Sequence, residues 1–270
     1  MPVATEQAGS VDLDPDLFAD QAHLCPRDMM AEGVTAVRER DTERRSGRKA
    51  NDSQMELAIL GATGSVGREI VTQALAAGHH VTVLVRHAPR PGQFDPRVTV
   101  IQGDANDSGS VDRAVAGSEA VISALGHVKR SPRDLLAVAS SNAIAAMRAH
   151  GIWRLIVLAS PSLTDQGDRP GLFYRFLLIA MPLGMRAATL DHRAQSRLVK
   201  DSGLDWTIVR GAALFTDGAH TGRYQAGPIT NDAARSISRA DLADFMLAAA
   251  THGTFVRDVP LVSQETSTHT

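Results

Sequence analysis

The chain has 270 residues, of which 43% are hydrophobic and 21% charged, and its formal net charge is −2 at pH 7. This length is typical of one large domain or of a domain with a tail. The small net charge excludes a general attraction to nucleic acid or to anionic lipid. A single cysteine, Cys25, excludes an internal disulfide framework, and we therefore expect a reducing, cytoplasmic location.

Residues 1–54 are predicted to form a polar N-terminal extension that is flexible or partly helical. Its first 20 residues contain acidic side chains but no Lys or Arg, unlike a secretory signal. The run Arg38–Lys49 is dense in charge, and we interpret it as solvated rather than as a phosphate contact. Such a segment buries too little apolar surface to offset its ordering entropy. Met55 stands directly before the first predicted strand, so the extension is either an appended tail or a start-site artefact.

From Glu56 onward, short apolar segments alternate with segments of helical pattern. The predicted strands are Leu57–Leu60, Val81–Val85, Val98–Ile101, Ala120–Ala124, Leu155–Leu158, Trp206–Val209 and Val259–Val262. The predicted helices are Ser65–Ala77, a helix to Val115 that Asp107 or Ser108 can cap, a long helix with Pro132 in its first turn that ends near Gly151, Thr189–Asp201 and Asp241–Ala250. Continuous apolar strands are typical of parallel sheets covered on both faces. The alternation therefore predicts an α/β fold with a doubly wound, mostly parallel sheet, in a single domain over residues 55–270.

The most apolar stretch, Leu172–Met185, is shorter than the ~20 apolar residues that span a bilayer, so we expect no membrane segment. We interpret it as a buried helix or a pocket wall. Its larger apolar side chains either wall a pocket for a flat hydrophobic substrate or belong to the core of a connecting helix. They are Phe173, Tyr174, Phe176, Leu177 and Met181.

A glycine-rich turn, Gly61–Gly67, follows the first strand and opens the first helix. Its spacing, G-x-x-G-x-x-G, is a variant of the dinucleotide-binding fingerprint. Glycine is needed because a Cβ would block the tight turn and the approach of the backbone to a pyrophosphate. The helix N-terminus adds unpaired N–H groups and a partial positive charge. The predicted cofactor-binding residues of this turn are Gly61, Thr63, Gly64, Ser65, Val66 and Gly67.

The second strand ends in Arg86, at the position where NAD-specific sites usually place an acidic residue. That acidic residue accepts a hydrogen bond from the ribose 2′-hydroxyl, whereas an arginine suits the 2′-phosphate of NADP. We therefore expect the cofactor to be NADP(H) in preference to NAD(H).

Three more segments follow strands that lie near a dinucleotide in such folds. Asp104 follows the third strand, where the adenine end of the cofactor usually lies. The alternative interpretation of Asp104 is a residue that caps the next helix. Leu125 and Gly126 follow the fourth strand, and the glycine permits close approach of a cofactor. Ser160 follows the fifth strand, where ligands of open α/β sheets bind, although Ser160 and Pro161 also fit a simple turn.

The sequence lacks the Tyr-x-x-x-Lys pair that many short-chain dehydrogenases use for proton transfer. Tyr174 is followed four positions later by Leu178, and Tyr224 by Pro228. No metal-binding pattern is found either, so no metal is expected. Without a fixed general acid, the sequence favours hydride transfer to a conjugated acceptor that is protonated by solvent or a bound water.

From Met55 to about Val262, the sequence resembles the atypical short-chain dehydrogenases with NmrA-like folds, and among them the group of biliverdin and flavin reductases. The matching segments are Gly61–Gly67, Val81–Arg86, Gly103–Asp104, Ala116–Gly126, Ala145–Gly151, Ser202–Arg210, Thr221–Tyr224 and Ile237–Leu247. This resemblance implies a Rossmann fold and an NADPH-dependent reductase of flavins or other flat conjugated rings.

The same resemblance implies roles for particular residues. The positions of Leu125, Gly126 and Ser160 line the nicotinamide side in this family, and the pair Asp191 and His192 on the helix before the sixth strand is shared. Ser160, Asp191, His192 and Ser196 are accordingly the candidate catalytic residues.

Two departures from the family pattern leave the substrate open. Ser196 stands where related proteins have His or Glu, and Gly211 replaces the proline that usually follows the sixth strand. We expect the substrate, a flat conjugated small molecule, to bind within residues 161–196 and 211–236. The protein is expected to be a monomer or a homodimer.

Two other functions fit the same scaffold. One is an NmrA-type, non-catalytic NADP-binding redox sensor that docks a partner through its charged extension. The other is a reductase, cyclase or epimerase of secondary-metabolite biosynthesis, which the fold alone does not exclude.

Overall fold

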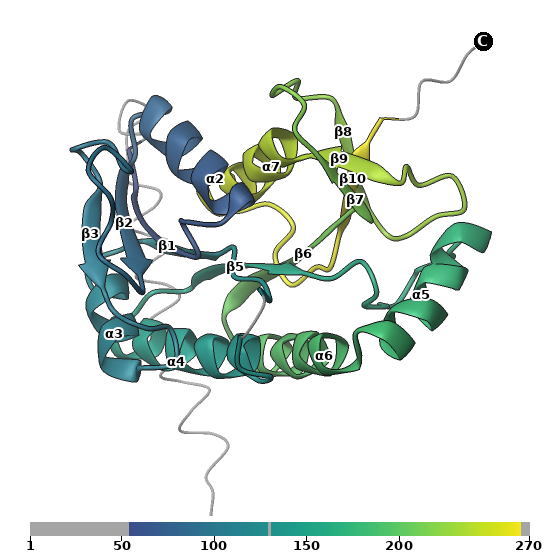
Figure 1. Ribbon diagram of the computed structural model, residues 1–270, viewed down its shortest axis with the longest axis horizontal. Helices are drawn as coiled ribbons and strands as arrows, with labels where there is room; N and C mark the ends of the chain where they lie inside the picture. The colour runs from purple at the N-terminus through teal and green to yellow at the C-terminus, as the bar shows by residue number, and fades with distance from the viewer. Residues whose placement is uncertain (1–53, 129–130, 266–270) are drawn as a thin grey trace, which may run out of the picture. The chain divides into compact units, whose positions relative to one another are not determined.

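The computed structural model describes residues 54–128 and 131–265. The predictions for Cys25 and for the extension up to residue 53 lie outside these ranges. An eight-stranded sheet forms the centre of the described chain (Figure 1). In spatial order its strands are β3 (Thr99–Gln102), β2 (His80–Val85), β1 (Glu56–Leu60), β4 (Ala120–Ser123), β5 (Arg154–Ala159), β6 (Asp205–Gly211), β10 (Leu261–Gln264) and β8 (Tyr224–Gly227). Neighbouring strands are parallel except β10 and β8, which confirms the doubly wound, mostly parallel sheet.

Helices cover both faces of this sheet (Figure 1). The helices on one face are α2 (Ser65–Ala76) and α7 (Arg239–His252), and those on the other are α3 (Ser108–Val115), α4 (Leu135–Ala149) and α6 (Arg186–Lys200). Side chains alternate along each strand, so each strand serves two cores. In β1, Leu57 and Ile59 belong to the core under α2 and α7, whereas Ala58 and Leu60 belong to the core over α3 and α4. This double burial explains why the strands are continuously apolar.

Helix α4 begins at Leu135, so the prediction that Pro132 lies in its first turn was wrong. Its first turn is capped instead by a carboxylate from α6, which accepts the backbone N–H groups of Leu136 and Ala137. The sequence pattern carries no sign of a cap that comes from a distant helix. Helix α6 likewise begins at Arg186, one turn before its predicted start.

Three short strands were not predicted. One is β8, and the others are β7 (Leu214–Thr216) and β9 (Ser236–Ser238), which form a separate two-stranded parallel sheet. Their segments, LFT, YQAG and SIS, carry few apolar side chains, so that neither a continuous apolar run nor a clear alternation marks them as strands.

Helix α5 (Leu172–Gly184) confirms a helix in the most apolar stretch but not its burial. Leu172, Phe176 and Ile179 lie on one helical face and are 84%, 70% and 67% exposed. The opposite face is anchored by Tyr174, which is buried and donates its hydroxyl hydrogen to the carbonyl oxygen of Ala234 at 2.8 Å. None of the helices in the described ranges is long and apolar enough to cross a membrane.

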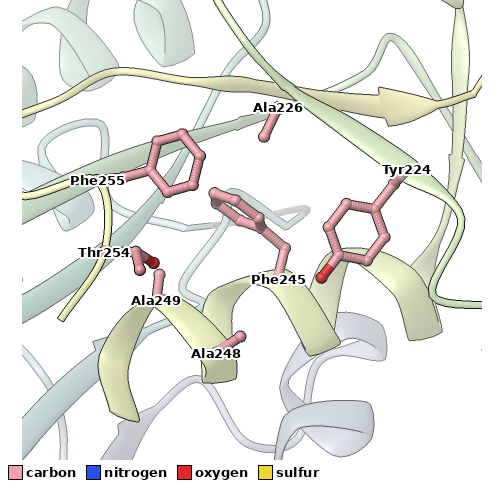
Figure 2. A pocket seen from close by; sticks show the side chains of 7 residues that line it. All are labelled: Tyr224, Ala226, Phe245, Ala248, Ala249, Thr254 and Phe255. Carbon is pink, nitrogen blue, oxygen red and sulfur yellow. The ribbon is translucent and has the colours of Figure 1, made fainter. Parts of the chain in front are cut away.

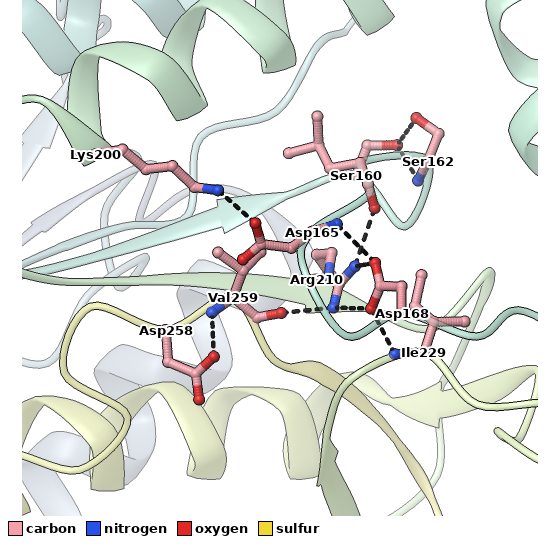
Figure 3. Close-up of polar contacts among 10 residues, drawn as sticks. Ser160, Ser162, Asp165, Asp168, Lys200, Arg210, Ile229, Asp258 and Val259 are labelled. Atoms are coloured by element: carbon pink, nitrogen blue, oxygen red, sulfur yellow. Dashed lines mark hydrogen bonds and ion pairs between the residues drawn. The ribbon is translucent and has the colours of Figure 1, made fainter.

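A buried ion pair fixes the loop after β5 to strand β6 (Figure 3). Both terminal nitrogens of Arg210 donate to the carboxylate of Asp168, with Nη1–Oδ2 at 2.6 Å and Nη2–Oδ1 at 3.0 Å. Arg210 also donates to the carbonyl oxygens of Leu163 and Val259, and Asp168 accepts the backbone N–H of Ile229. Burial alone would raise the pKa of Asp168, but the hydrogen bonds from Arg210 and from backbone N–H groups lower it overall. The pair thus joins the two segments in which the substrate is expected.

We predict that Asp168→Asn lowers the free energy of unfolding by about 3 kcal/mol, because Arg210 is left buried without its counter-charge. Urea denaturation measures this loss. The matched control is Asp165→Asn, which removes the contact of Asp165 with Lys200 at 2.7 Å, where the side chains are 29% and 34% exposed. This partly exposed pair should contribute less than about 1 kcal/mol. Equal losses in the two variants would contradict the prediction.

Candidate functional site

The strand order of the sheet reverses between β1 and β4, and ligands of open α/β sheets bind at the carboxyl ends of the strands on either side of such a point. The two chain segments that leave these strands are in direct contact. A Cβ on Gly61, after β1, would lie 2.8 Å from the carbonyl carbon of Ala124 and 2.9 Å from the backbone nitrogen of Leu125, after β4. The structure therefore brings together two of the segments predicted to bind the cofactor.

The glycine turn is tight enough to require its glycines. Gly61 has a φ of +87°, a conformation that residues with a Cβ rarely adopt. The N–H of Gly64 donates to the carbonyl oxygen of Gly61 at 3.0 Å. A Cβ on Gly67 would lie only 2.1 Å from that same oxygen. Because the glycines carry no side chains and the turn packs closely on the helix, backbone atoms form the surface of the turn that a ligand could contact.

The N-terminus of α2 presents free backbone donors at this turn. Its N-cap, Gly64, has no side chain to cap the helix, and no acidic residue occupies the first turn. Thr63, Gly64 and Ser65 are exposed, whereas Val66 is buried in the core, so that only the backbone of Val66 can contact a cofactor. Unpaired N–H groups and the positive end of the helix dipole suit an anion such as a pyrophosphate.

Arg86 and Asp104 lie at the ends of the adjacent strands β2 and β3. Arg86 directly follows β2 and is exposed. Asp104 is half-buried, and its Oδ1 accepts the backbone N–H of Asn106 at 2.9 Å. The cap of α3 is Asp107, whose Oδ2 accepts the N–H of Ser110 at 2.9 Å, so the alternative of Asp104 as the helix cap was wrong.

Ser160 forms a local turn at the end of β5 (Figure 3). Its Oγ lies 2.8 Å from the Oγ of Ser162 and accepts the backbone N–H of Ser162 at 3.1 Å. The carbonyl oxygen of Ser160 also accepts the N–H of Leu163 at 3.2 Å. The hydroxyl of Ser160 therefore stabilises the turn at the start of the loop that the Arg210–Asp168 pair holds.

Gly126, in the segment after β4, is exposed, with open space where a Cβ would stand.

Asp191 caps helix α4 and binds a histidine that the sequence analysis did not single out. Its carboxylate accepts the backbone N–H groups of Leu136 and Ala137 at 2.8 Å and 2.9 Å. Its Oδ2 also lies 2.8 Å from Nε2 of His127. His127 directly follows Gly126, and this position after a strand-end glycine is the one sequence signal that could have found it.

His192 lies beside this pair. Its ring meets the ring of His127 edge to face, with centroids 6.2 Å apart. Burial, with a smaller contribution from His127, lowers the pKa of His192 to about 4 against opposing effects of Gln195 and Asp191. Ser196 is half-buried one turn further along α6. Three ionisable side chains thus gather around the start of α4, at the carboxyl end of β4.

The segments in which the substrate is expected, residues 161–196 and 211–236, also make apolar packing contacts. Phe173 and Leu177 are half-buried against a small cluster that includes Ile229. Gly211 lies within β6 rather than after it, and a Cβ there would lie 2.5 Å from the ring of Phe215. A larger residue at this departure from the family pattern would therefore require the ring of Phe215 to move, and that ring is 39% exposed.

A cavity of about 290 Å³ lies between β8 and α7 (Figure 2). Its lining residues are Tyr224, Ala226, Phe245, Ala248, Ala249, Thr254 and Phe255. The Tyr224 hydroxyl donates to Oδ2 of Asp244 at 2.7 Å, and burial raises the pKa of Tyr224. The carbonyl of Phe255 accepts the hydroxyl of Thr207, in the amino-terminal half of β6. This cavity therefore lies away from the carboxyl edge of the sheet where the glycine turn stands.

The half-buried His192 should make the protein acid-sensitive. Because its folded pKa of about 4 lies below the ordinary value of 6.5, the unfolded chain takes up the proton first as the pH falls. Stability is fully present above about pH 6.5 and is lost towards about pH 4, by roughly 1.4 kcal/mol per pH unit. We predict that His192→Asn flattens this slope in urea denaturation series between about pH 7 and about pH 5. Parallel slopes in the two proteins would show that another group is responsible.

The comparisons with known proteins agree with this geometry. A model of the NAD(P)H-binding family matches residues 61–253, which is more than half of the chain. An uncharacterised protein of Mycobacterium tuberculosis is 24% identical over 161 residues, which cover 60% of this chain but only 15% of that much longer protein.

Two solved structures share the fold over most of the chain. A short-chain dehydrogenase/reductase from Veillonella parvula, in complex with NADP, is 21% identical with a TM-score of 0.64, covering 80% of this chain and 97% of that one. ChuY, an anaerobilin reductase from Escherichia coli O157:H7, is 24% identical with a TM-score of 0.64, covering 77% and 97%. The family model, the glycine turn and the reversal of strand order lead to one conclusion: this chain belongs to the NAD(P)H-binding family.

Proposed function

We propose that the chain is an NADPH-dependent oxidoreductase that transfers a hydride to a flavin-like or other flat conjugated ring. The observation that carries this proposal is the contact of Gly61 with Ala124 and Leu125 at the reversal of strand order, beside the uncapped N-terminus of α2. A dinucleotide that binds along this edge has its pyrophosphate at the helix N-terminus.

In this proposal, seven of the predicted cofactor residues are assigned to parts of the dinucleotide. The backbone N–H groups of Ser65, Val66 and Gly67 hold the pyrophosphate, and Arg86 meets the 2′-phosphate of the adenine ribose. Asp104, after the neighbouring strand, lies at the adenine end. On the other side of the turn, Leu125 and Gly126 line the nicotinamide.

The chemistry fits a conjugated acceptor better than an alcohol or a ketone. Bound NADPH supplies a hydride from its nicotinamide ring. Neither tyrosine can act as the proton donor that a Tyr-Lys pair provides. Tyr174 is buried and its hydroxyl donates to the carbonyl oxygen of Ala234, and the hydroxyl of Tyr224 donates to Asp244. A conjugated ring delocalises the negative charge that arrives with the hydride and so requires less help from a strong acid. The anaerobilin reductase among the structural neighbours supports this choice.

The cofactor preference is tested by Arg86→Ala. A charge-assisted hydrogen bond contributes about 1.5–3 kcal/mol, so its loss should weaken NADPH binding roughly tenfold to a hundredfold while NADH binding changes less than about twofold. Calorimetric titration of both nucleotides measures the ratio. Arg97→Ala is the matched control, because Arg97 is an exposed arginine that pairs with Asp95. A ratio that Arg86→Ala leaves unchanged would contradict a 2′-phosphate contact.

The reaction is tested with the purified full chain and a panel of acceptors. We expect that flavins and quinone-imine dyes accelerate NADPH oxidation, whereas simple ketones do not. Gly67→Ala should abolish this rate, because its Cβ would lie 2.1 Å from the carbonyl oxygen of Gly61. Thermal unfolding of the variant distinguishes a lost site from a lost fold.

Tight NADPH binding without turnover of any acceptor would contradict the reductase and favour the redox sensor. Turnover of a ketone or a sugar nucleotide, but not of conjugated rings, would favour the biosynthetic alternative.

A further inference from the structure

A ring reduced by hydride transfer would need a proton, and His127 directly follows the two residues assigned to the nicotinamide side, Leu125 and Gly126. This histidine is on the segment that leaves β4 beside the glycine turn. Its side chain is 17% exposed, so that a ligand can reach it, whereas the side chain of its partner Asp191 is 1% exposed. Exposed imidazoles are common on protein surfaces, but an imidazole held by a buried carboxylate has a fixed orientation.

The geometry of the pair determines which ring nitrogen is available. An ionised carboxylate only accepts hydrogen bonds, so Nε2 of His127 donates to Oδ2 of Asp191 at 2.8 Å. Asp191 cannot turn away, because the N–H groups of Leu136 and Ala137 hold both of its oxygens. Nδ1 of His127 is left as the nitrogen that can serve a ligand.

We propose that His127, positioned by Asp191, is the general acid that protonates the conjugated ring after hydride transfer. This proposal rests on the proposed reductase function and names the proton source that the absent Tyr-Lys pair leaves open. No motif singles out His127, and its role follows from its contact with Asp191 and its place after Gly126.

The other ionisable groups in the described ranges near this edge fit the role less well. His192 has its Nδ1 buried and a pKa of about 4, so that at neutral pH it is a neutral imidazole, which is a far weaker acid than an imidazolium. Lys200 is engaged with Asp165 at 2.7 Å. Asp191 and His192, both on α6, are the titratable groups that the structure places against His127.

The ring receives a hydride, that is one proton and two electrons, from bound NADPH and becomes an anion. The Nδ1–H bond of the His127 imidazolium breaks, and its proton forms a bond to the anionic atom of the ring. The imidazole is left neutral and regains a proton from solvent. In sum, NADPH, one proton and the oxidised ring give NADP⁺ and the dihydro ring.

The test compares two acceptors that differ in their need for a proton. A quinone-imine dye becomes an anion when it accepts a hydride and must be protonated, whereas the N-methylphenazinium cation becomes neutral and needs no proton. We expect His127→Gln to lower kcat with the dye by about a hundredfold, in the range of general acid catalysis, and to change kcat with the cation by less than about threefold. Rates are corrected for the uncatalysed reaction.

The matched control is His150→Gln. His150 also pairs with an aspartate, Asp112 at 2.9 Å, but at an exposed position where α4 ends. This variant should leave both rates unchanged.

The rates of the variants with the two acceptors distinguish a general acid from a structural role and from protonation by solvent. A selective loss with the dye, and its recovery when imidazole is added to His127→Ala, support the general acid. An equal loss with both acceptors shows that His127 only maintains the structure, and no loss with either shows that solvent supplies the proton; both results overturn the proposal. A wild-type protein that oxidises NADPH with neither acceptor overturns the reductase function itself.

Discussion

The site depends on the close contact between two backbone segments that leave the sheet where its strand order reverses. Gly61 lies against Ala124 and Leu125, and Gly67 lies against the carbonyl oxygen of Gly61. No side chain fits between these segments, so the first turn of α2 and the segment after β4 are held side by side. The N–H groups of that turn and the residues after Ala124 consequently lie close to each other. A larger residue at either glycine would separate the parts that a dinucleotide has to bridge.

A second constraint operates through Asp191. One buried carboxylate caps helix α4 and holds the ring of His127, so it joins α6, the start of α4 and the segment after β4. On the other side, the Arg210–Asp168 pair joins the loop after β5 to the segment around Ile229. Fixed polar contacts thus position both sides of the space expected for the substrate. Helix α5 differs, because it leaves Leu172, Phe176 and Ile179 exposed.

Much of this fold is predictable from the sequence, because the strands are continuously apolar and the glycine turn has characteristic spacing. The geometry of this turn follows directly from its sequence, since a Cβ on Gly61 or Gly67 would lie within 2.8 Å of backbone atoms. The role of Asp191 was not predictable in the same way. The resemblance drew attention to it as catalytic, whereas its carboxylate is engaged in capping a helix that begins 56 positions earlier in the chain, at Leu135.

His127 escaped notice for a related reason. A lone histidine in a loop carries no pattern, and its meaning appears only when folding brings α6 beside the segment after β4. The short strands β7, β8 and β9 and the exposure of α5 depend in the same way on tertiary contacts rather than on local sequence.

The central claim is that a phosphorylated dinucleotide lies along the edge between β1 and β4. A crystal structure of the chain grown with NADPH tests it most directly. We expect the pyrophosphate on the N–H groups of Ser65 to Gly67, the 2′-phosphate at Arg86 and the nicotinamide beside Gly126 and His127. A nucleotide bound elsewhere, or a nicotinamide directed away from this edge, would contradict the account.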